Sequence, residues 1–178
     1  SMANSSIERS TVVLDKEATR TCVRVSSMAD SSTAPQKGRA EAAGRGTATS
    51  SLLLFAATHI SDDHRDCLLC WPHMLVRAPL LRAADILIDL RNQRISAQAE
   101  AEWRQLAAQL PNPRVSFCVT NYTKFTKSQS GGQAGAMGAM HDAFHAGHFA
   151  GYNWVMRLNP DVLILNERPF ARLIRPNS

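Results

Sequence analysis

The chain has 178 residues, a length typical of one domain with its own hydrophobic core. Apolar residues make up 44% and charged residues 20%, as in an average soluble globular protein, and the four cysteines are too few for a disulfide-stapled mini-domain. No apolar run approaches the ~20 residues of a membrane-spanning helix, so we expect no membrane span. The net charge of +5 is spread without a basic block, so we expect no binding to nucleic acid.

Residues 1–50 are rich in Ser, Thr, Ala and Gly and contain no aromatic residue. Ser1 and Met2 look like a cloning remnant, so we expect the natural N-terminus to lie upstream. Because this composition buries too little apolar surface to offset the entropy lost on ordering, we predict a mostly disordered lead-in. One short strand is a candidate within it, at residues 11–14.

From residue 51 onwards, apolar runs of strand length alternate with stretches of helix length. In chain order we expect a strand over 52–57, a helix over 59–77, a strand over 84–90, a helix over 96–110, a strand over 114–120, a helix over 134–147 and a strand over 152–158. This alternation is typical of βαβ units. We therefore predict an α/β fold over residues 51–178, a three-layer Rossmann-like domain with a mainly parallel sheet and flanking helices.

The last predicted strand ends in a short polar break, Asn159-Pro160-Asp161, after which the sequence becomes apolar again. Proline cannot donate a ladder hydrogen bond, so the break belongs at the end of a strand. Open α/β sheets bind ligands at the carboxyl edge of their strands, and we expect Asn159 and Asp161 to point out of that edge. A hard divalent cation that bridges to a diphosphate needs only one or two protein oxygens. The alternative is an exposed capping turn.

Two neighbouring tracts resemble the centre of the GT-A glycosyltransferases. Residues 132–140, GQAGAMGAM, are similar to the family's helix pattern (K/Q)-x-x-A-(M/L)-x-x-(A/L), and residues 151–162, GYNWVMRLNPDV, to its strand Y-D-W-V-x-x-L-D-x-D. The resemblance covers residues 51–167. It implies a GT-A (Rossmann-like) domain that binds a UDP- or GDP-linked sugar with Mn²⁺ or Mg²⁺ and transfers the sugar to an unknown acceptor.

The resemblance also implies roles for individual residues. Asp161 matches the second acid of the DxD motif, which binds the metal, and Asn159 matches the first. Thr58 and His59 match the positions that hold the base and the ribose. The remaining residues that the family would place around the nucleotide and its phosphates are Lys124, Lys127, Gln133, Met137 and Arg157. The two lysines lie in a polar loop, 121–132, whose glycines lead into a helix and suit phosphate, although it is no Walker A loop.

Two departures from the family pattern stand out. Asn159 replaces an acid, which removes one negative charge and weakens metal binding. The sequence ends at Ser178, 17 residues after Asp161, whereas family members continue into an acceptor-binding half with the catalytic base. We therefore expect a donor-binding half without an assigned catalytic base, either a truncated transferase or a degenerate binding and assembly module that forms homo-oligomers. A Golgi or secretory location rests on the resemblance alone.

A histidine cluster supports a different enzyme class. The pattern H-D-x-x-H is formed on one helix face by His141, Asp142 and His145. It differs from the zincin motif H-E-x-x-H only in its acid, and in that motif the histidines bind zinc and the carboxylate is the general base. His148 shares this face but is poorly placed as a third ligand. The alternative function is therefore a zinc-dependent hydrolase centred on His141 and His145.

A cysteine pair, Cys67 and Cys70, lies between His64 and His73 in a predicted helix. One helix cannot close four such ligands around one ion, and the neighbouring acids oppose thiolate formation. We predict that both cysteines are buried structural thiols.

Overall fold

The structure is a computed structural model, and it describes residues 9–15, 18–25, 52–92, 94–122 and 132–174. Its elements follow one another along the chain as strands and helices that mostly alternate. They are β1 (Arg9–Asp15), β2 (Ala18–Val25), β3 (Leu52–Thr58), α1 (Asp62–Val76), α2 (Pro79–Arg82), β4 (Asp85–Asn92), α3 (Ala97–Ala107), β5 (Val115–Tyr122), α5 (Gly132–His145), β6 (Trp154–Arg157) and α6 (Arg168–Ile174).

The strands form one six-stranded sheet in the order β1-β2-β5-β4-β3-β6. Strands β3, β4, β5 and β6 are parallel, while β1 and β2 pair antiparallel with each other and β2 pairs antiparallel with β5. The predicted α/β fold with a mostly parallel sheet is confirmed. The chain builds the sheet from β3 through β4 to β5, then returns across β3 and adds β6 on its other side.

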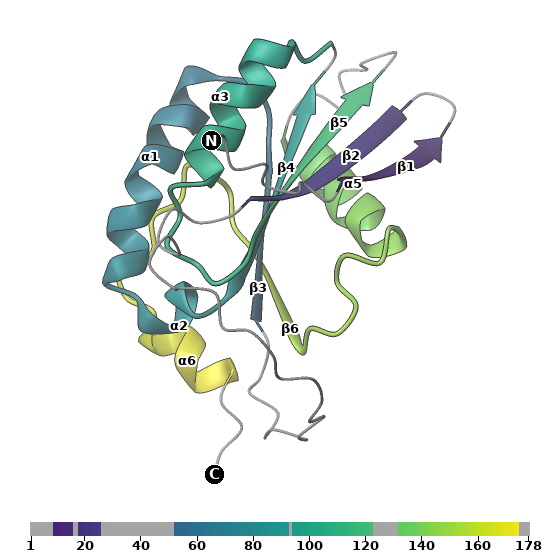
Figure 1. The fold of residues 1–178 in the computed structure, drawn as a ribbon. Coiled ribbons are helices and arrows are strands. Elements are labelled where there is room, and N and C mark those ends of the chain that lie inside the picture. Colours follow the sequence, from purple (N-terminus) through teal and green to yellow (C-terminus); the bar gives the residue numbers. More distant parts are fainter. Residues whose placement is uncertain (1–8, 16–17, 26–51, 93, 123–131, 175–178) are drawn as a thin grey trace, which may run out of the picture.

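Helices cover both faces of the sheet, with α1 and α3 on one face and α5 on the other (Figure 1). Strand β3 contributes to both layers, because successive side chains of a strand point to opposite faces. Leu52 and Leu54 pack with residues of α1 and α3, whereas Leu53 and Phe55 pack with residues of α5. This burial on both faces explains the continuous apolar run at 52–57.

The hairpin β1–β2 lies in the segment that we expected to be mostly disordered. The candidate strand at 11–14 falls within β1, but β2 was not predicted. Strand β2 pairs along the whole of β5, from Ala18 opposite Tyr122 to Val25 opposite Val115. Its stability comes from this non-local pairing and from burial of Val23, not from local apolar content. The other residues of 1–50 lie outside the described part of the chain.

Local interactions fix the helix ends. The Ser61 side chain accepts a hydrogen bond from His64 N at 3.2 Å, so α1 begins three residues after the predicted start, with Asp62 and Asp63 in its first turn. After β6, the Glu167 carboxylate accepts from Leu80 N at 2.9 Å, which ties the last segment of the chain to α2.

Across the described residues, none of the helices combines the length and the apolar character that crossing a bilayer requires.

Candidate functional site

The sheet reverses its building direction between β3 and β6. From β3 the chain passes through α1 to β4, which lies beside β3 on one edge. From β5 it passes through α5 to β6, which lies beside β3 on the opposite edge. Open α/β sheets bind ligands in the crevice outside the carboxyl ends of the strands at such a switch point. The predicted residues lie at these two strand ends. Thr58 is the last residue of β3 and His59 follows it, while Asn159 and Asp161 follow β6.

Strand register brings these two loops to nearly the same level. Arg157 lies opposite Phe55, and Leu158 N donates to Phe55 O at 2.9 Å, so the parallel ladder continues one residue past β6. At about 3.3 Å per residue, Asn159 lies about 7 Å beyond Arg157, and Thr58 lies about 10 Å beyond Phe55. The difference along the strands is therefore about one residue.

Helix α1 holds the turn after β6 in place. The Trp71 indole Nε1 donates to Pro160 O at 3.0 Å, and the Trp71 side chain is fully buried. Within the turn, Val162 N donates to Asn159 O at 3.0 Å. Pro160 is buried while Asn159 and Asp161 are exposed, so the turn is anchored through its proline and presents its two polar side chains to solvent.

The oxygens of this turn fit a hard divalent cation. No described residue hydrogen-bonds or pairs with the Asp161 carboxylate. Asn159 Oδ1 accepts from Arg157 Nη2 at 2.6 Å, which leaves the amide oxygen a second lone pair. A carboxylate and an amide oxygen are ligands that Mg²⁺ and Mn²⁺ accept, with other oxygens completing the shell. The predicted pair therefore suits a cation that receives its remaining ligands from a diphosphate and water.

Arg157 adds a donor for an anion beside this turn. Its Nη2 is bound to Asn159, but its buried Nε has no hydrogen-bond partner among the described residues. A buried donor without a partner costs about 1–3 kcal/mol. A phosphate oxygen bound at this guanidinium would satisfy it, because arginine binds phosphate through paired donors.

At the end of β3, Thr58 and His59, which the family resemblance assigns to the base and the ribose, contact the start of α1. Thr58 is buried, and its hydroxyl lies 2.9 Å from His64 Nδ1 and donates to His59 O at 3.2 Å. The hydroxyl is thus engaged with the start of α1. The His59 ring lies edge-on to His64, with centroids 4.4 Å apart. Partial burial, and to a lesser extent repulsion from His64, lower the pKa of His59, so its ring is neutral at pH 7.

No contact between described residues brings the other residues that we predicted to bind the nucleotide to this edge of the sheet. Met137 lies on α5 with 58% of its surface exposed. Gln133 lies in the first turn of α5. Lys124 and Lys127 lie outside the described residues.

The histidine cluster on α5 is partly committed to other contacts. The rings of His141 and His145 lie 4.3 Å apart. Asp142, which a zinc hydrolase would use as its general base, forms an ion pair with Arg91 of β4. His148 points instead toward Cys22 of β2, with Nε2 3.5 Å from Sγ.

The predicted burial of the C-x-x-C cysteines differs from the structure. Cys67 is partly buried and Cys70 is exposed, and both are free thiols. The Cys70 thiol donates to Asp66 O at 3.6 Å, within the helix. The spacing of three residues puts the two thiols on neighbouring but distinct parts of the α1 surface, and Leu68 between them takes the core position.

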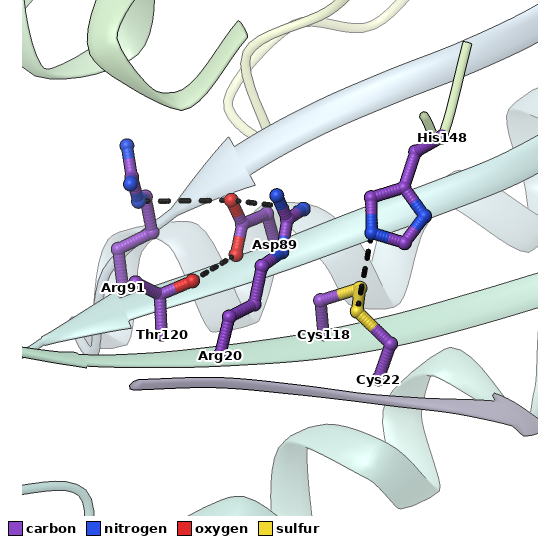
Figure 2. The surroundings of a disulfide bond; sticks show 7 residues. All are labelled: Arg20, Cys22, Asp89, Arg91, Cys118, Thr120 and His148. Carbon is purple, nitrogen blue, oxygen red and sulfur yellow. Dashed lines mark hydrogen bonds and ion pairs between the residues drawn. A yellow bond between two sulfur atoms is a disulfide. The ribbon is translucent and has the colours of Figure 1, made fainter. Parts of the chain in front are cut away.

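Sequence reasoning missed a polar cluster beneath α5, drawn in Figure 2. Asp89 is fully buried, with one carboxylate oxygen 3.3 Å from Arg20 and 3.6 Å from Arg91, and the other accepting from Thr120 at 2.9 Å. A buried charge is stable only when it is paired. The sequence sign was Asp89 itself, a carboxylate between Ile88 and Leu90 inside the predicted strand 84–90.

Beside this network, Cys22 and Cys118 form a disulfide between β2 and β5, with Cα atoms 4.0 Å apart. His148 stands next to it because Gly147, at φ 75°, ends α5 in a left-handed turn. His148 N then donates to Ala143 O at 3.0 Å, as in a Schellman motif. Burial, then repulsion from Arg20, lower the pKa of His148. Cys22, Cys118 and His148 form a group of three metal-ligating side chains within the described residues.

Comparisons with protein-family models, with curated proteins and with solved structures found no match.

Proposed function

We propose that the chain is a GT-A-like donor-binding domain that holds a UDP- or GDP-linked sugar at the switch point between β3 and β6. The observation that carries this proposal is the convergence of two loops at one level of the sheet: His59 after β3, and the Asn159–Asp161 turn after β6. The order β5-β4-β3-β6 is that of the first four strands of a doubly wound nucleotide-binding sheet.

Each residue of the turn has a distinct task in this proposal. Asp161 holds a divalent cation, and Asn159 supports it with its amide oxygen. Arg157 binds the diphosphate through its guanidinium, whose Nε is buried and becomes accessible to the ligand when the side chain moves. When bound, the cation supplies charge neutralisation for the diphosphate as a leaving group. Trp71 fixes the backbone of the turn through Pro160 O, which places Asn159 and Asp161 at this end of the sheet without ligand.

We assign the contact with the nucleobase to His59. Its imidazole, partly exposed and neutral at pH 7, offers a flat surface for a nucleobase at the end of β3. Thr58 keeps that loop in position through its hydroxyl bonds to His59 O and His64. We therefore assign Thr58 a positioning role, in place of the direct base contact implied by the family resemblance.

The test is calorimetric titration of UDP and GDP into the chain, with and without Mn²⁺. We expect metal-dependent binding of one nucleotide per chain. Removing the charged ligand in Asp161→Ala weakens binding about tenfold or more, which corresponds to about 1.4 kcal/mol. The matched control is Glu102→Ala, which removes one exposed carboxylate from α3 and leaves affinity unchanged.

Two results would overturn the proposal. One is a folded chain that binds neither nucleotide with Mn²⁺ present. The other is equal affinity in Asp161→Ala and Glu102→Ala, which would place the site elsewhere.

A further inference from the structure

The cluster beneath α5 is independent of the proposed nucleotide site and carries a different chemistry. Cys22 and Cys118 face each other across two antiparallel strands, and His148 reaches them from the turn after α5 (Figure 2). The two sulfurs and one imidazole nitrogen all lie within 4.8 Å of one another. In the disulfide form, the sulfurs are bonded to each other and are not available as thiolate ligands.

We propose that the reduced chain binds one Zn²⁺ through Cys22 Sγ, Cys118 Sγ and His148 Nε2, with water as the fourth ligand. The disulfide and the zinc complex are then alternative states of one site.

The spacing of the ligands matches tetrahedral zinc. With Zn–S of about 2.3 Å and Zn–N of about 2.0 Å, a sulfur and a nitrogen on the same ion lie about 3.5 Å apart. The distance from His148 Nε2 to Cys22 Sγ is 3.5 Å. The Cα atoms of the two cysteines are 4.0 Å apart on the same face of the sheet, so two thiolates stand side by side without backbone movement. Only the sulfurs must separate, which breaking their bond allows.

The charges around the site also favour zinc. Arg20 and Arg91 are offset by Asp89 and Asp142, so the neighbouring network adds no net charge. Two thiolates, one neutral imidazole and Zn²⁺ sum to zero, which a buried site tolerates. Thiolate and imidazole are ligands that zinc prefers, and that Mg²⁺ and Ca²⁺ do not.

The conversion between the disulfide and the zinc complex conserves atoms and electrons. A dithiol reductant gives two electrons and two protons to the Cys22–Cys118 bond, which becomes two thiols, and the reductant becomes a disulfide. Zinc binding then releases the two thiol protons. In the reverse direction a disulfide oxidant takes two electrons from the two zinc-bound thiolates and is itself reduced to two thiolates, so the Cys22–Cys118 bond re-forms and Zn²⁺ is released.

The experiment uses the chain with Cys67→Ser and Cys70→Ser, because the free thiols of α1 also attract zinc. The chain is reduced with excess dithiothreitol, the reductant is removed without oxygen, and Zn²⁺ is titrated against a chromophoric chelator. A parallel titration uses Co²⁺, whose thiolate charge-transfer and visible bands show tetrahedral coordination. We expect one ion per reduced chain, these bands in the Co²⁺ form, and no binding to the oxidised chain.

The variants distinguish a defined zinc site from nonspecific binding of zinc to thiols. His148→Gln weakens zinc binding about tenfold or more, and Cys118→Ser abolishes the two-thiolate spectrum. The matched control His145→Gln removes the exposed last histidine of α5, three residues before His148, and binds zinc as the parent does. The proposal is overturned if the reduced chain takes up no zinc, or if His148→Gln and His145→Gln bind it equally. Neither of these two results depends on Cys118→Ser, so the proposal remains testable if that variant does not fold.

Discussion

Asp89→Asn should destabilise the fold strongly. The Asp89 carboxylate is fully buried between the guanidinium groups of Arg20 and Arg91, and the Arg20 side chain is only 1% exposed. Asparagine keeps nearly the same shape and can still accept from Thr120. It removes the negative charge and leaves two buried or nearly buried cations without their shared counter-ion.

Breaking a buried ion pair by removing one partner costs about 3–5 kcal/mol, because the remaining charge stays desolvated. With a urea dependence of about 2 kcal/mol per molar, the unfolding midpoint should fall by about 1.5–2.5 M. The assay is equilibrium unfolding in urea, followed by circular dichroism on the oxidised protein.

The matched control is Asp66→Asn. Asp66 also pairs with an arginine, Arg65, at 3.2 Å, but its side chain is 64% exposed. Exposed pairs contribute less than about 1 kcal/mol, so this midpoint should barely move. If Asp89→Asn moves the midpoint no more than the control does, then burial is not what makes this network important to stability.

Three further predictions concern single contacts. Burial and the hydrogen bond to Asp85 raise the pKa of Tyr152 to about 12, from 10.0 in the unfolded chain. The stability that this bond contributes is therefore full below pH 10 and is lost as pH rises from 10 toward 12; Tyr152→Phe should flatten that loss in urea titrations, and an unchanged alkaline profile would contradict it. Gly147→Ala should cost about 1–2 kcal/mol in thermal unfolding from its φ of 75° alone, since nothing lies within 4 Å of the added Cβ, and a neutral effect would contradict the left-handed turn. Glu167→Ala should cost about 1 kcal/mol in urea unfolding by leaving Leu80 N and Leu81 N without their acceptor, and an unchanged midpoint would show that solvent replaces it.

The parallel part of the fold was accessible from the sequence because its strands are buried on both faces. Residues 52–57 contain no polar side chain, and such a run has few alternatives to a central strand. The longer helices between the strands, α1, α3 and α5, were expected from their lengths, and their ends shifted, whereas the four-residue helix α2 was not predicted. At Ser61 the shift follows from one side-chain bond, in which its hydroxyl accepts from His64 N.

Strand β2 could not be found in the same way. Its sequence, ATRTCVRV, shows no regular alternation of polar and apolar residues, and it lies within a segment that is poor in apolar residues. What makes it a strand is its pairing with β5, about 100 residues away, and local propensity says nothing about such a partner. The same distance hid the disulfide, since Cys22 and Cys118 are 96 residues apart and meet only in this register.

The candidate nucleotide site was partly accessible. The proline in Asn159-Pro160-Asp161 predicted a strand end, and the turn lies after β6, where the switch point follows from the strand order. The bond from Trp71 to Pro160 O, which anchors the turn, could not be predicted, because it joins residues 89 positions apart. Nor could the hydroxyl contacts of Thr58, which depend on where the first turn of α1 places His64.

The central claim is that a divalent cation and a nucleotide meet at the turn after β6. The most direct measurement is paramagnetic broadening by Mn²⁺ in amide NMR spectra of the ¹⁵N-labelled chain, recorded with UDP or GDP present and absent. We predict nucleotide-dependent broadening of the amides of Asp161, Val162 and His59, while the amides of Leu52 and Trp154, at the opposite end of the same strands, stay sharp. Broadening centred away from the turn, or identical with and without nucleotide, would contradict the claim.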